Sequence, residues 1–226
     1  MHNNDIPVIT IDGPSASGKG TIAQLVAAKL GFHYLDSGAL YRLVALKAAQ
    51  SHTQIQNHDL LTDIARNLDV KFNGQDIYLD GKTVTDEIRK EECGILASQL
   101  AAYPEIREAL KERQREFCQP PGLVTDGRDM GSVIFPNAIL KVFLTASARI
   151  RAQRRYNQLI EKGMNANIAN LLHDIEKRDE RDSNRSIAPL QQGADTRLLD
   201  TTSLTISQAQ DTVLSWYNEI CARTRV

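Results

Sequence analysis

The stretch GPSASGKGT, residues 13–21, decides the fold. It follows a short continuous apolar run, VITI at residues 8–11, which is typical of a strand buried on both faces of a parallel sheet. Residues 19–30 follow, with apolar side chains at helical spacing, and Gly31 supplies a C-terminal stop. The order strand, glycine-rich loop and helix is the context in which such a loop binds phosphate.

The loop matches the pattern GxxxxGK. In such a loop the backbone N–H groups point at a phosphate, the next helix contributes its positive end, and Lys19 reaches the β and γ oxygens. A flexible loop that matches by chance is the alternative, and the flanking strand and helix argue against it. The predicted nucleoside triphosphate site consists of Gly13, Pro14, Ser15, Ala16, Ser17, Gly18, Lys19, Gly20 and Thr21.

The loop departs from the usual pattern directly after the lysine. Gly20 stands where a Ser or Thr hydroxyl usually binds Mg²⁺, so the hydroxyl moves one position to Thr21. This GKGT form resembles nucleoside monophosphate kinases more than GTPases, and no guanine-reading segment such as NKxD is present. We expect Mg²⁺ to be held largely through water and the nucleotide phosphates, with Thr21 as the one candidate for a direct ligand.

The rest of the chain alternates buried strands with helical patterns. Strand-like runs lie at residues 123–126, 140–144 and 197–200, which predicts an α/β fold with a mainly parallel sheet flanked by helices. The last helix is predicted to open at Thr205, with Gln208 completing a capping box.

Residues 68–84 break this alternation. Three short β-like runs are joined by Asn73-Gly74 and Asp80-Gly81, dipeptides that favour type I′ hairpin turns. This segment predicts a small antiparallel insert.

Composition limits the functional classes. The 226 residues carry 27 basic and 28 acidic side chains, a net charge of −1 that favours neither nucleic acid nor a membrane surface as partner. With no apolar run of membrane-spanning length and no signal-peptide pattern at the N-terminus, we expect a cytoplasmic protein. Separately, we expect a monomer. The three cysteines are widely spaced, which argues against disulfides or a zinc site.

The stretch LDSGALYR, residues 35–42, forms a turn that leads into a helix carrying Arg42. It could hold a second anionic or polar ligand. Taken alone it is more typical of a helix N-cap, in which Asp36 or Ser37 satisfies backbone amides, and the two roles are compatible.

The stretch TDGRDMG, residues 125–131, lies at the C-terminal end of a predicted buried strand. Ligands of open α/β sheets bind beyond these strand ends, so Asp126, Arg128 and Asp129 are expected at the same rim as the glycine-rich loop. The alternative is a turn closed by a surface ion pair of little energetic value.

Two charged clusters are more ambiguous. Arg178, Asp182 and Arg185 share one helix face, which by itself is more typical of a solvated surface than of a site. A basic cluster of Arg151, Arg154 and Arg155, before Lys162-Gly163, could close over phosphates as a lid.

These stretches, in this order, resemble the bacterial cytidylate kinase family over nearly the whole chain. The resemblance is carried by PVITIDGPSASGKGT, LDSGALYR, ASQLAAYPEIREAL, DGRDMGSVIFP, RDERDSNRSIAPL and the antiparallel insert. It implies a single P-loop kinase domain over residues 1–226, with a monophosphate-binding region at about 37–107 and a helical lid at about 150–170. The implied reaction is Mg²⁺-dependent phosphoryl transfer from ATP to CMP or dCMP.

The resemblance also implies roles for single residues. Residues matching the cytosine contacts are Ser37, Arg107 and Asp129. Those near the sugar are Ser98, Arg178 and Asp182, and those around the acceptor phosphate are Arg42, Arg128 and Arg185. We assign Lys19, Arg128 and Arg155 to catalysis.

The base assignment agrees with the chemistry of cytosine. A carboxylate such as Asp129 accepts from the 4-amino group while Arg107 donates to N3 and O2, and uracil reverses that edge. The rival readings are another P-loop kinase acting on UMP, AMP or a non-nucleotide such as shikimate, and a nucleotide-binding regulatory switch.

Overall fold

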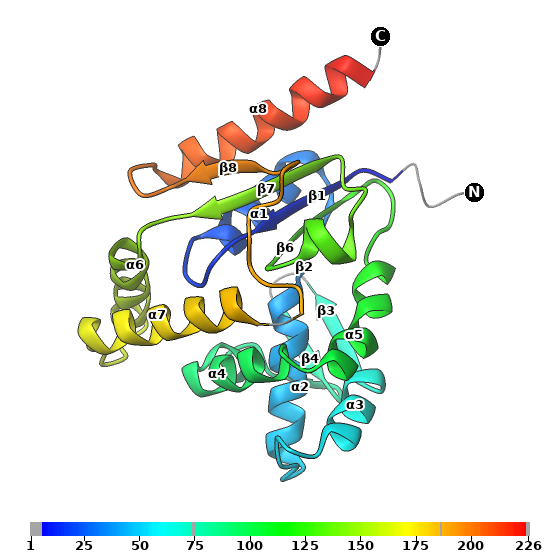
Figure 1. The fold of residues 1–226 in the computed structure, drawn as a ribbon, viewed down its shortest axis with the longest axis vertical. Helices are drawn as coiled ribbons and strands as arrows, with labels where there is room; N and C mark the ends of the chain where they lie inside the picture. The colour runs from blue at the N-terminus through cyan, green and yellow to red at the C-terminus, as the bar shows by residue number, and fades with distance from the viewer. Residues whose placement is uncertain (1–5, 74–75, 186, 225–226) are drawn as a thin grey trace. The chain divides into compact units, whose positions relative to one another are not determined.

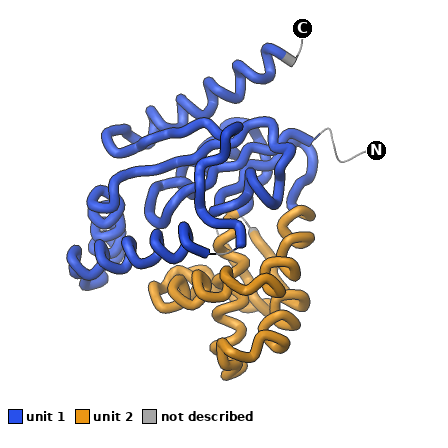
Figure 2. Tube along the Cα trace, viewed as in Figure 1, with its two compact units in different colours: residues 1–35, 117–226 blue, residues 36–116 orange. Residues whose placement is uncertain are grey.

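The structure is a computed structural model that describes residues 6–73, 76–185 and 187–224. The chain divides into two compact units (Figure 2). Unit 1 comprises residues 1–35 and 117–226, and unit 2 comprises residues 36–116. The glycine-rich loop belongs to unit 1, and the antiparallel insert belongs to unit 2.

Unit 1 is built around a 5-stranded sheet with the order β2-β6-β1-β7-β8 (Figure 1). Strand β1 is parallel to both of its neighbours, β6 and β7, and β7 is parallel to β8. The strands are β1 Val8–Asp12, β2 His33–Asp36, β6 Leu123–Gly127, β7 Leu140–Thr145 and β8 Arg197–Asp200. The four strands predicted from apolar runs are confirmed, whereas β2 was missed because its exposed His33 and its short length hide the pattern.

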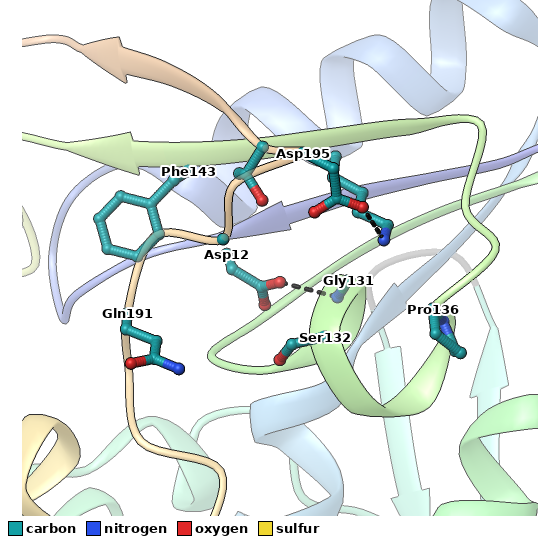
Figure 3. A pocket seen from close by; sticks show the side chains of 10 residues that line it. Asp12, Gly131, Ser132, Pro136, Phe143, Gln191 and Asp195 are labelled. Atoms are coloured by element: carbon teal, nitrogen blue, oxygen red, sulfur yellow. Dashed lines mark hydrogen bonds and ion pairs between the residues drawn. The ribbon is translucent and has the colours of Figure 1, made fainter.

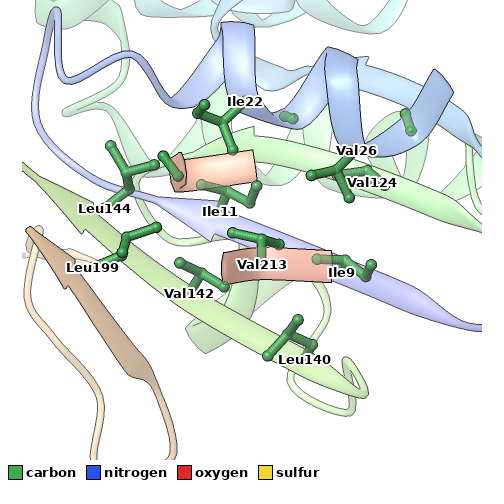
Figure 4. Packing of buried hydrophobic residues seen from close by; sticks show 13 residues of the cluster. Ile9, Ile11, Ile22, Val26, Val124, Leu140, Val142, Leu144, Leu199 and Val213 are labelled. Carbon is green, nitrogen blue, oxygen red and sulfur yellow. The ribbon is translucent and has the colours of Figure 1, made fainter. Parts of the chain in front are cut away.

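One face of this sheet packs on helices α1 (Lys19–Leu30) and α8 (Ile206–Thr224) (Figure 4). Ile9 and Ile11 of β1 are fully buried there, together with Val213 of α8. Because side chains alternate along a strand, Thr10 and Asp12 point to the opposite face. That face carries the short helix η3 (Met130–Ile134), whose backbone amides bind Asp12.

The predicted ends of α1 and α8 are confirmed. Gly31 is the C-cap of α1 in the left-handed conformation, with φ 67°. At the start of α8 the amide of Gln208 donates to Thr205 Oγ1 at 3.2 Å, and the amide of Thr205 donates to Gln208 Oε1 at 2.9 Å, which is a capping box.

The predicted lid segment, residues 150–170, lies in two further helices of unit 1 and the loop between them. They are α6 (Ala148–Glu161) and α7 (Ile168–Asn184), which pack against each other. Arg185 is the C-cap of α7 and lies just beyond the helix.

Unit 2 is a helical unit with a small antiparallel sheet of order β3-β4-β5. Its elements are α2 Ser37–Gln50, α3 His58–Arg66, β3 Val70–Asn73, β4 Asp76–Leu79, β5 Lys82–Thr83, η2 Glu87–Arg89, α4 Glu91–Leu100 and α5 Pro104–Glu116. The predicted insert is confirmed, and Asp80 and Gly81 have φ of 50° and 74°, as a type I′ turn requires. The other predicted turn includes Gly74, which lies outside the described residues.

Within the described part of the chain, no helix combines the length and the apolar character needed to cross a membrane.

Candidate active site

The glycine-rich loop has the backbone geometry of a phosphate cradle. A Cβ on Gly13 would lie 2.0 Å from the Leu144 carbonyl oxygen, so only glycine fits where the loop leaves β1. Gly18 is the N-cap of α1 with φ 95°, and α1 has neither a side-chain cap nor an acidic residue in its first turn. Its first amides and its positive end therefore suit a bound anion. Lys19 Nζ folds back onto this loop and donates to the Pro14 carbonyl at 3.2 Å.

Two arginines of α6 hold the loop from the lid segment. Arg151 Nη1 donates to the Ser15 carbonyl at 3.0 Å, and Arg154 Nη1 donates to the Ser17 carbonyl at 3.0 Å. Arg151 is only 4% exposed and also binds the Asp179 carboxylate in a bidentate pair. Arg155, the lid residue assigned to catalysis, follows on the same helix and is half-buried. The arginines that contact the loop carbonyls are thus neighbours of the one selected from the sequence.

Arg128 connects the loop to α7. Its Nη2 donates to Ser15 Oγ at 2.8 Å, and its Nε donates to Asp182 Oδ2 at 2.7 Å. Burial lowers the pKa of the Arg128 guanidinium, but the carboxylates of Asp182, Asp126 and Asp179 together outweigh burial and leave that pKa above its usual value. Arg128 is therefore a fixed cation beside the glycine-rich loop.

Asp129 and Arg185 form a second charged pair, next to the pair of Arg128 and Asp182. Arg185 Nη2 lies 3.7 Å from Asp129 Oδ1. Burial raises the pKa of Asp182, but Arg128 and then Arg185 and Arg178 outweigh burial and hold that pKa below its usual value. The structure thus brings together those predicted acceptor residues that belong to unit 1.

For these residues the solvated-surface interpretation of the charge pattern is wrong, and the surface-turn alternative for TDGRDMG is excluded. Asp182 is 5% exposed and the Arg185 side chain 6%, so their stretch is not the solvated surface that its charge pattern favoured. Asp126 and Asp129 are 4% and 7% exposed, so the TDGRDMG stretch is not a turn closed by a surface ion pair. A hydrogen bond joins Arg128, just after β6, to Asp182 of α7, and a helical charge pattern cannot reveal such a contact.

The remaining predicted acceptor residues lie in unit 2. Asp36 is the N-cap of α2 and accepts from the Ala39 amide at 3.1 Å, so the capping role is confirmed for Asp36, and Ser37 beside it is buried. Arg42 Nη1 donates to the Ile88 carbonyl at 2.6 Å and to the Lys90 carbonyl at 3.3 Å.

Ser98 and Arg107 come from neighbouring helices of unit 2. Ser98 is half-buried on α4, and Arg107 is 8% exposed on α5, with Nη1 donating to the Ala101 carbonyl at 3.4 Å. Arg42 and Arg107 are therefore both anchored by backbone carbonyls of unit 2.

Gly20 and Thr21, at the start of α1, have different surroundings. A Cβ on Gly20 would lie 3.5 Å from Tyr34 Oη and 3.7 Å from Asp126 Oδ1, and Tyr34 donates to Asp126 at 2.7 Å. The position that usually carries the hydroxyl thus faces Asp126, whereas Thr21 is exposed. Among the described residues, no group of three or more His, Cys, Asp or Glu side chains is arranged to hold a metal ion.

Sequence reasoning missed Asp12. Its carboxylate accepts from the Met130 and Gly131 amides at 2.9 and 2.8 Å, and it lines a cavity of about 260 Å³ on the sheet face opposite α1 (Figure 3). The available signal was an acidic residue at the end of an apolar run, directly before the glycine-rich loop.

Strand β1, the glycine-rich loop and α1 define a P-loop nucleotide-binding protein, and the buried arginine and aspartate cluster beside the loop suits a second anionic ligand. The sequence model of one kinase family, described as cytidylate kinase, matches residues 9–219. The chain therefore belongs to the cytidylate kinase family.

Its relatives match over almost their full length. A cytidylate kinase from Nitrosomonas europaea is 58% identical, covering 97% of this chain and 98% of the relative. One from Chromobacterium violaceum is 57% identical, covering 95% and 96% respectively. A solved gluconokinase structure from Sinorhizobium meliloti is similar at a TM-score of 0.48 and 15% identity, covering 97% of this chain and 95% of that chain, which is too remote to carry an argument.

Proposed function

We propose that this protein transfers the γ-phosphoryl group of ATP to CMP or dCMP, forming ADP and CDP or dCDP. One observation carries the proposal beyond family membership. Arg128 binds Ser15 of the glycine-rich loop and Asp182, a predicted acceptor residue, at the same time, so one side chain joins the proposed donor and acceptor sites.

Catalysis of this transfer requires positioned substrates and positive charge, and it does not require a general base. A phosphoryl transition state spreads negative charge over its equatorial oxygens, and the attacking 5′-phosphate oxygen of CMP is already anionic near neutral pH. Lys19 would cover the β and γ phosphates, and Arg128 and Arg185 the acceptor phosphate, with Arg155 brought in by the lid. These groups orient the acceptor oxygen in line and stabilise the developing charge.

Cytosine recognition in this proposal uses a carboxylate and a guanidinium. Asp129 accepts from the 4-amino group, and Arg107 donates to N3 and O2. Uracil would turn its O4 toward Asp129 and leave a buried polar group unpaired, which discriminates strongly. Ser37 completes the base contacts, and Ser98, Arg178 and Asp182 take the sugar. Arg42 joins the acceptor phosphate after leaving the Ile88 and Lys90 carbonyls.

Mg²⁺ belongs to this proposal as the partner of ATP, and it supplies charge neutralisation on the β and γ phosphates. Thr21 is the only residue that we propose as a direct ligand, and phosphate oxygens and water complete the coordination. We further propose a monomer in the cytoplasm that binds neither nucleic acid nor membrane.

Closure of the lid, residues 150–170, and of the monophosphate-binding region, residues 37–107, would exclude water, which otherwise accepts the phosphoryl group. We expect a smaller radius of gyration by solution scattering when a bisubstrate analogue is bound. An unchanged radius would exclude closure.

The direct test is product identification. Incubation with ATP, Mg²⁺ and CMP should yield CDP and ADP in equal amounts by chromatography. ADP formation without CDP would instead support a nucleotide-hydrolysing switch.

A further inference from the structure

Asp12 is a buried carboxylate, and each of its two oxygens accepts a backbone hydrogen bond from the same turn. It ends β1, one residue before the glycine-rich loop begins, and is 8% exposed. Its Oδ1 accepts from the Met130 amide at 2.9 Å and its Oδ2 from the Gly131 amide at 2.8 Å. The carboxylate thus closes a contact between segments that lie 118 and 119 residues apart in the chain.

The turn that Asp12 holds carries the residue proposed to read the base. Asp129 immediately precedes Met130 and is the N-cap of η3, without a side-chain capping bond and with φ −146° and ψ 23°. Asp129 therefore lacks the local side-chain bond that often fixes a helix start. The two amides that follow Asp129 are instead fixed by a side chain from β1.

The surroundings of Gly131 keep this turn close to the sheet. A Cβ on Gly131 would lie 2.6 Å from Thr10 Oγ1 and 3.2 Å from the Lys141 side chain. Glycine thus permits the close approach at which Asp12 reaches both amides. The approach and the paired hydrogen bonds make the position of Asp129 depend on β1.

The charged groups around Asp12 come from four elements. They are Lys19 of α1, Asp129 at the start of η3, Lys141 of β7, and Asp195 in the segment before β8. Lys141 and Asp195 form an ion pair at the rim of the cavity, in which Asp195 is 67% exposed (Figure 3). Burial raises the pKa of Asp12 to about 6, although the Gly131 and Met130 amides oppose the rise.

We propose that Asp12 is a positioning residue for acceptor recognition: as a carboxylate it holds the Met130 and Gly131 amides and thereby fixes Asp129 against the cytosine ring. This inference rests on the proposed function. Asp12 touches neither nucleotide in this proposal and acts through the turn. When Asp12 takes up a proton, one of its oxygens becomes a hydroxyl and one of the two amides loses its acceptor.

A pair of matched variants separates this role from simple structural support. Asp12→Asn keeps the shape of the side chain but leaves only one oxygen that accepts well. Asp195→Asn also removes a negative charge from the lining of the cavity, but Asp195 is bonded to Lys141 and not to the Met130 and Gly131 amides. We expect Asp12→Asn to raise KM for CMP about tenfold, equivalent to losing one hydrogen bond to a charged group, and to leave KM for ATP within about twofold. The preference for CMP over UMP should fall by a similar factor. Asp195→Asn should change none of these.

The wild-type protein alone provides the second measurement. In ¹H–¹⁵N spectra without nucleotide, the Met130 and Gly131 amide signals should shift with a midpoint near pH 6, and the same midpoint should remain in Asp195→Asn. This experiment avoids the phosphate of CMP, which titrates in the same range. The titration can also be carried out if Asp12→Asn does not fold, because it uses the wild-type protein.

The outcomes are distinguishable from failure of the proposed function. If wild type does not phosphorylate CMP, the proposed function fails, and the amide titration still reports whether Asp12 holds the turn. If wild type phosphorylates CMP but Asp12→Asn alters KM for ATP and CMP equally, or leaves the CMP to UMP preference intact, the positioning role is overturned. Met130 and Gly131 amide signals that stay constant over the whole pH range in which a carboxyl group titrates would overturn it as well.

Discussion

Ser15 and Arg128 are joined by a hydrogen bond of 2.8 Å between guanidinium Nη2 and hydroxyl Oγ, although 113 residues separate them in the chain. Ser15 is also held through its carbonyl by Arg151. The orientation of the glycine-rich loop and that of the proposed acceptor arginine therefore depend on each other.

Ser15→Ala tests this link. The variant removes the acceptor of one hydrogen bond from a charged donor, while Arg128 keeps its bond to Asp182. We expect the free energy of unfolding to fall by about 1–2 kcal/mol and kcat to fall several-fold. Denaturant unfolding and a coupled ADP assay measure the two effects. Ser207→Ala, which removes an exposed hydroxyl, is the control, and equal behaviour of both variants would contradict the link.

Arg128→Met should be strongly destabilising. It leaves the Asp182 carboxylate, 8% exposed as a side chain, without its closest partner, and breaking one side of a buried pair costs about 3–5 kcal/mol. Urea unfolding checks the value. Removing both charges in Arg128→Met with Asp182→Leu should recover part of the loss, and no recovery would show that the pair does not account for it.

Lys19→Met should impair catalysis while leaving the fold intact. Lys19 Nζ donates to a carbonyl of its own loop, and removing a donor from developing phosphoryl charge typically costs about 10²–10³ in turnover. We expect the same loss with CMP and with dCMP, measured by initial rates at saturating ATP. Near-normal turnover would refute the phosphate cradle.

Asp129→Ala should lose kcat/KM for CMP by two or more orders of magnitude, because a buried base edge is left unpaired. The KM for ATP should change little. Steady-state kinetics with each nucleotide varied in turn gives both values. Unchanged CMP kinetics would remove Asp129 from the acceptor site.

Asp12 predicts how stability depends on pH. Its pKa is about 6 in the folded protein against a model-peptide value of 3.8. Because the folded value is the higher one, the stabilisation from the protonated group is complete below pH 3.8 and is lost as the pH rises through 6. The total change is roughly 3 kcal/mol. The stability of Asp12→Asn relative to wild type should therefore increase between pH 4 and 7, as measured by thermal unfolding, and a constant difference would contradict this.

The sequence predicted the P-loop core well because its signals are local. The apolar run of β1, the glycines of the loop and the periodicity of α1 each occur within a few residues, and Gly31 and the Thr205 capping box fixed helix ends correctly. The Asp80-Gly81 turn was found for the same reason. The edge strand β2 has no such local signal.

The burial of the predicted acceptor residues in α7 and at its C-cap could not be predicted from the spacing of charged residues. Asp182 and Arg185 show the charge spacing of a solvated helix, and only the approach of Arg128 from the end of β6 shows otherwise. The contacts of Arg151 and Arg154 with the loop, and of Asp12 with the Met130 turn, join residues far apart in sequence. Such contacts depend on the packing of whole elements, which one sequence does not display.

The central claim, transfer from ATP to a cytidine monophosphate, is tested most directly by ADP release in parallel reactions with CMP, dCMP, UMP, AMP and shikimate. The account predicts much higher kcat/KM for CMP and dCMP than for any other acceptor. Faster turnover of UMP than of CMP would contradict it.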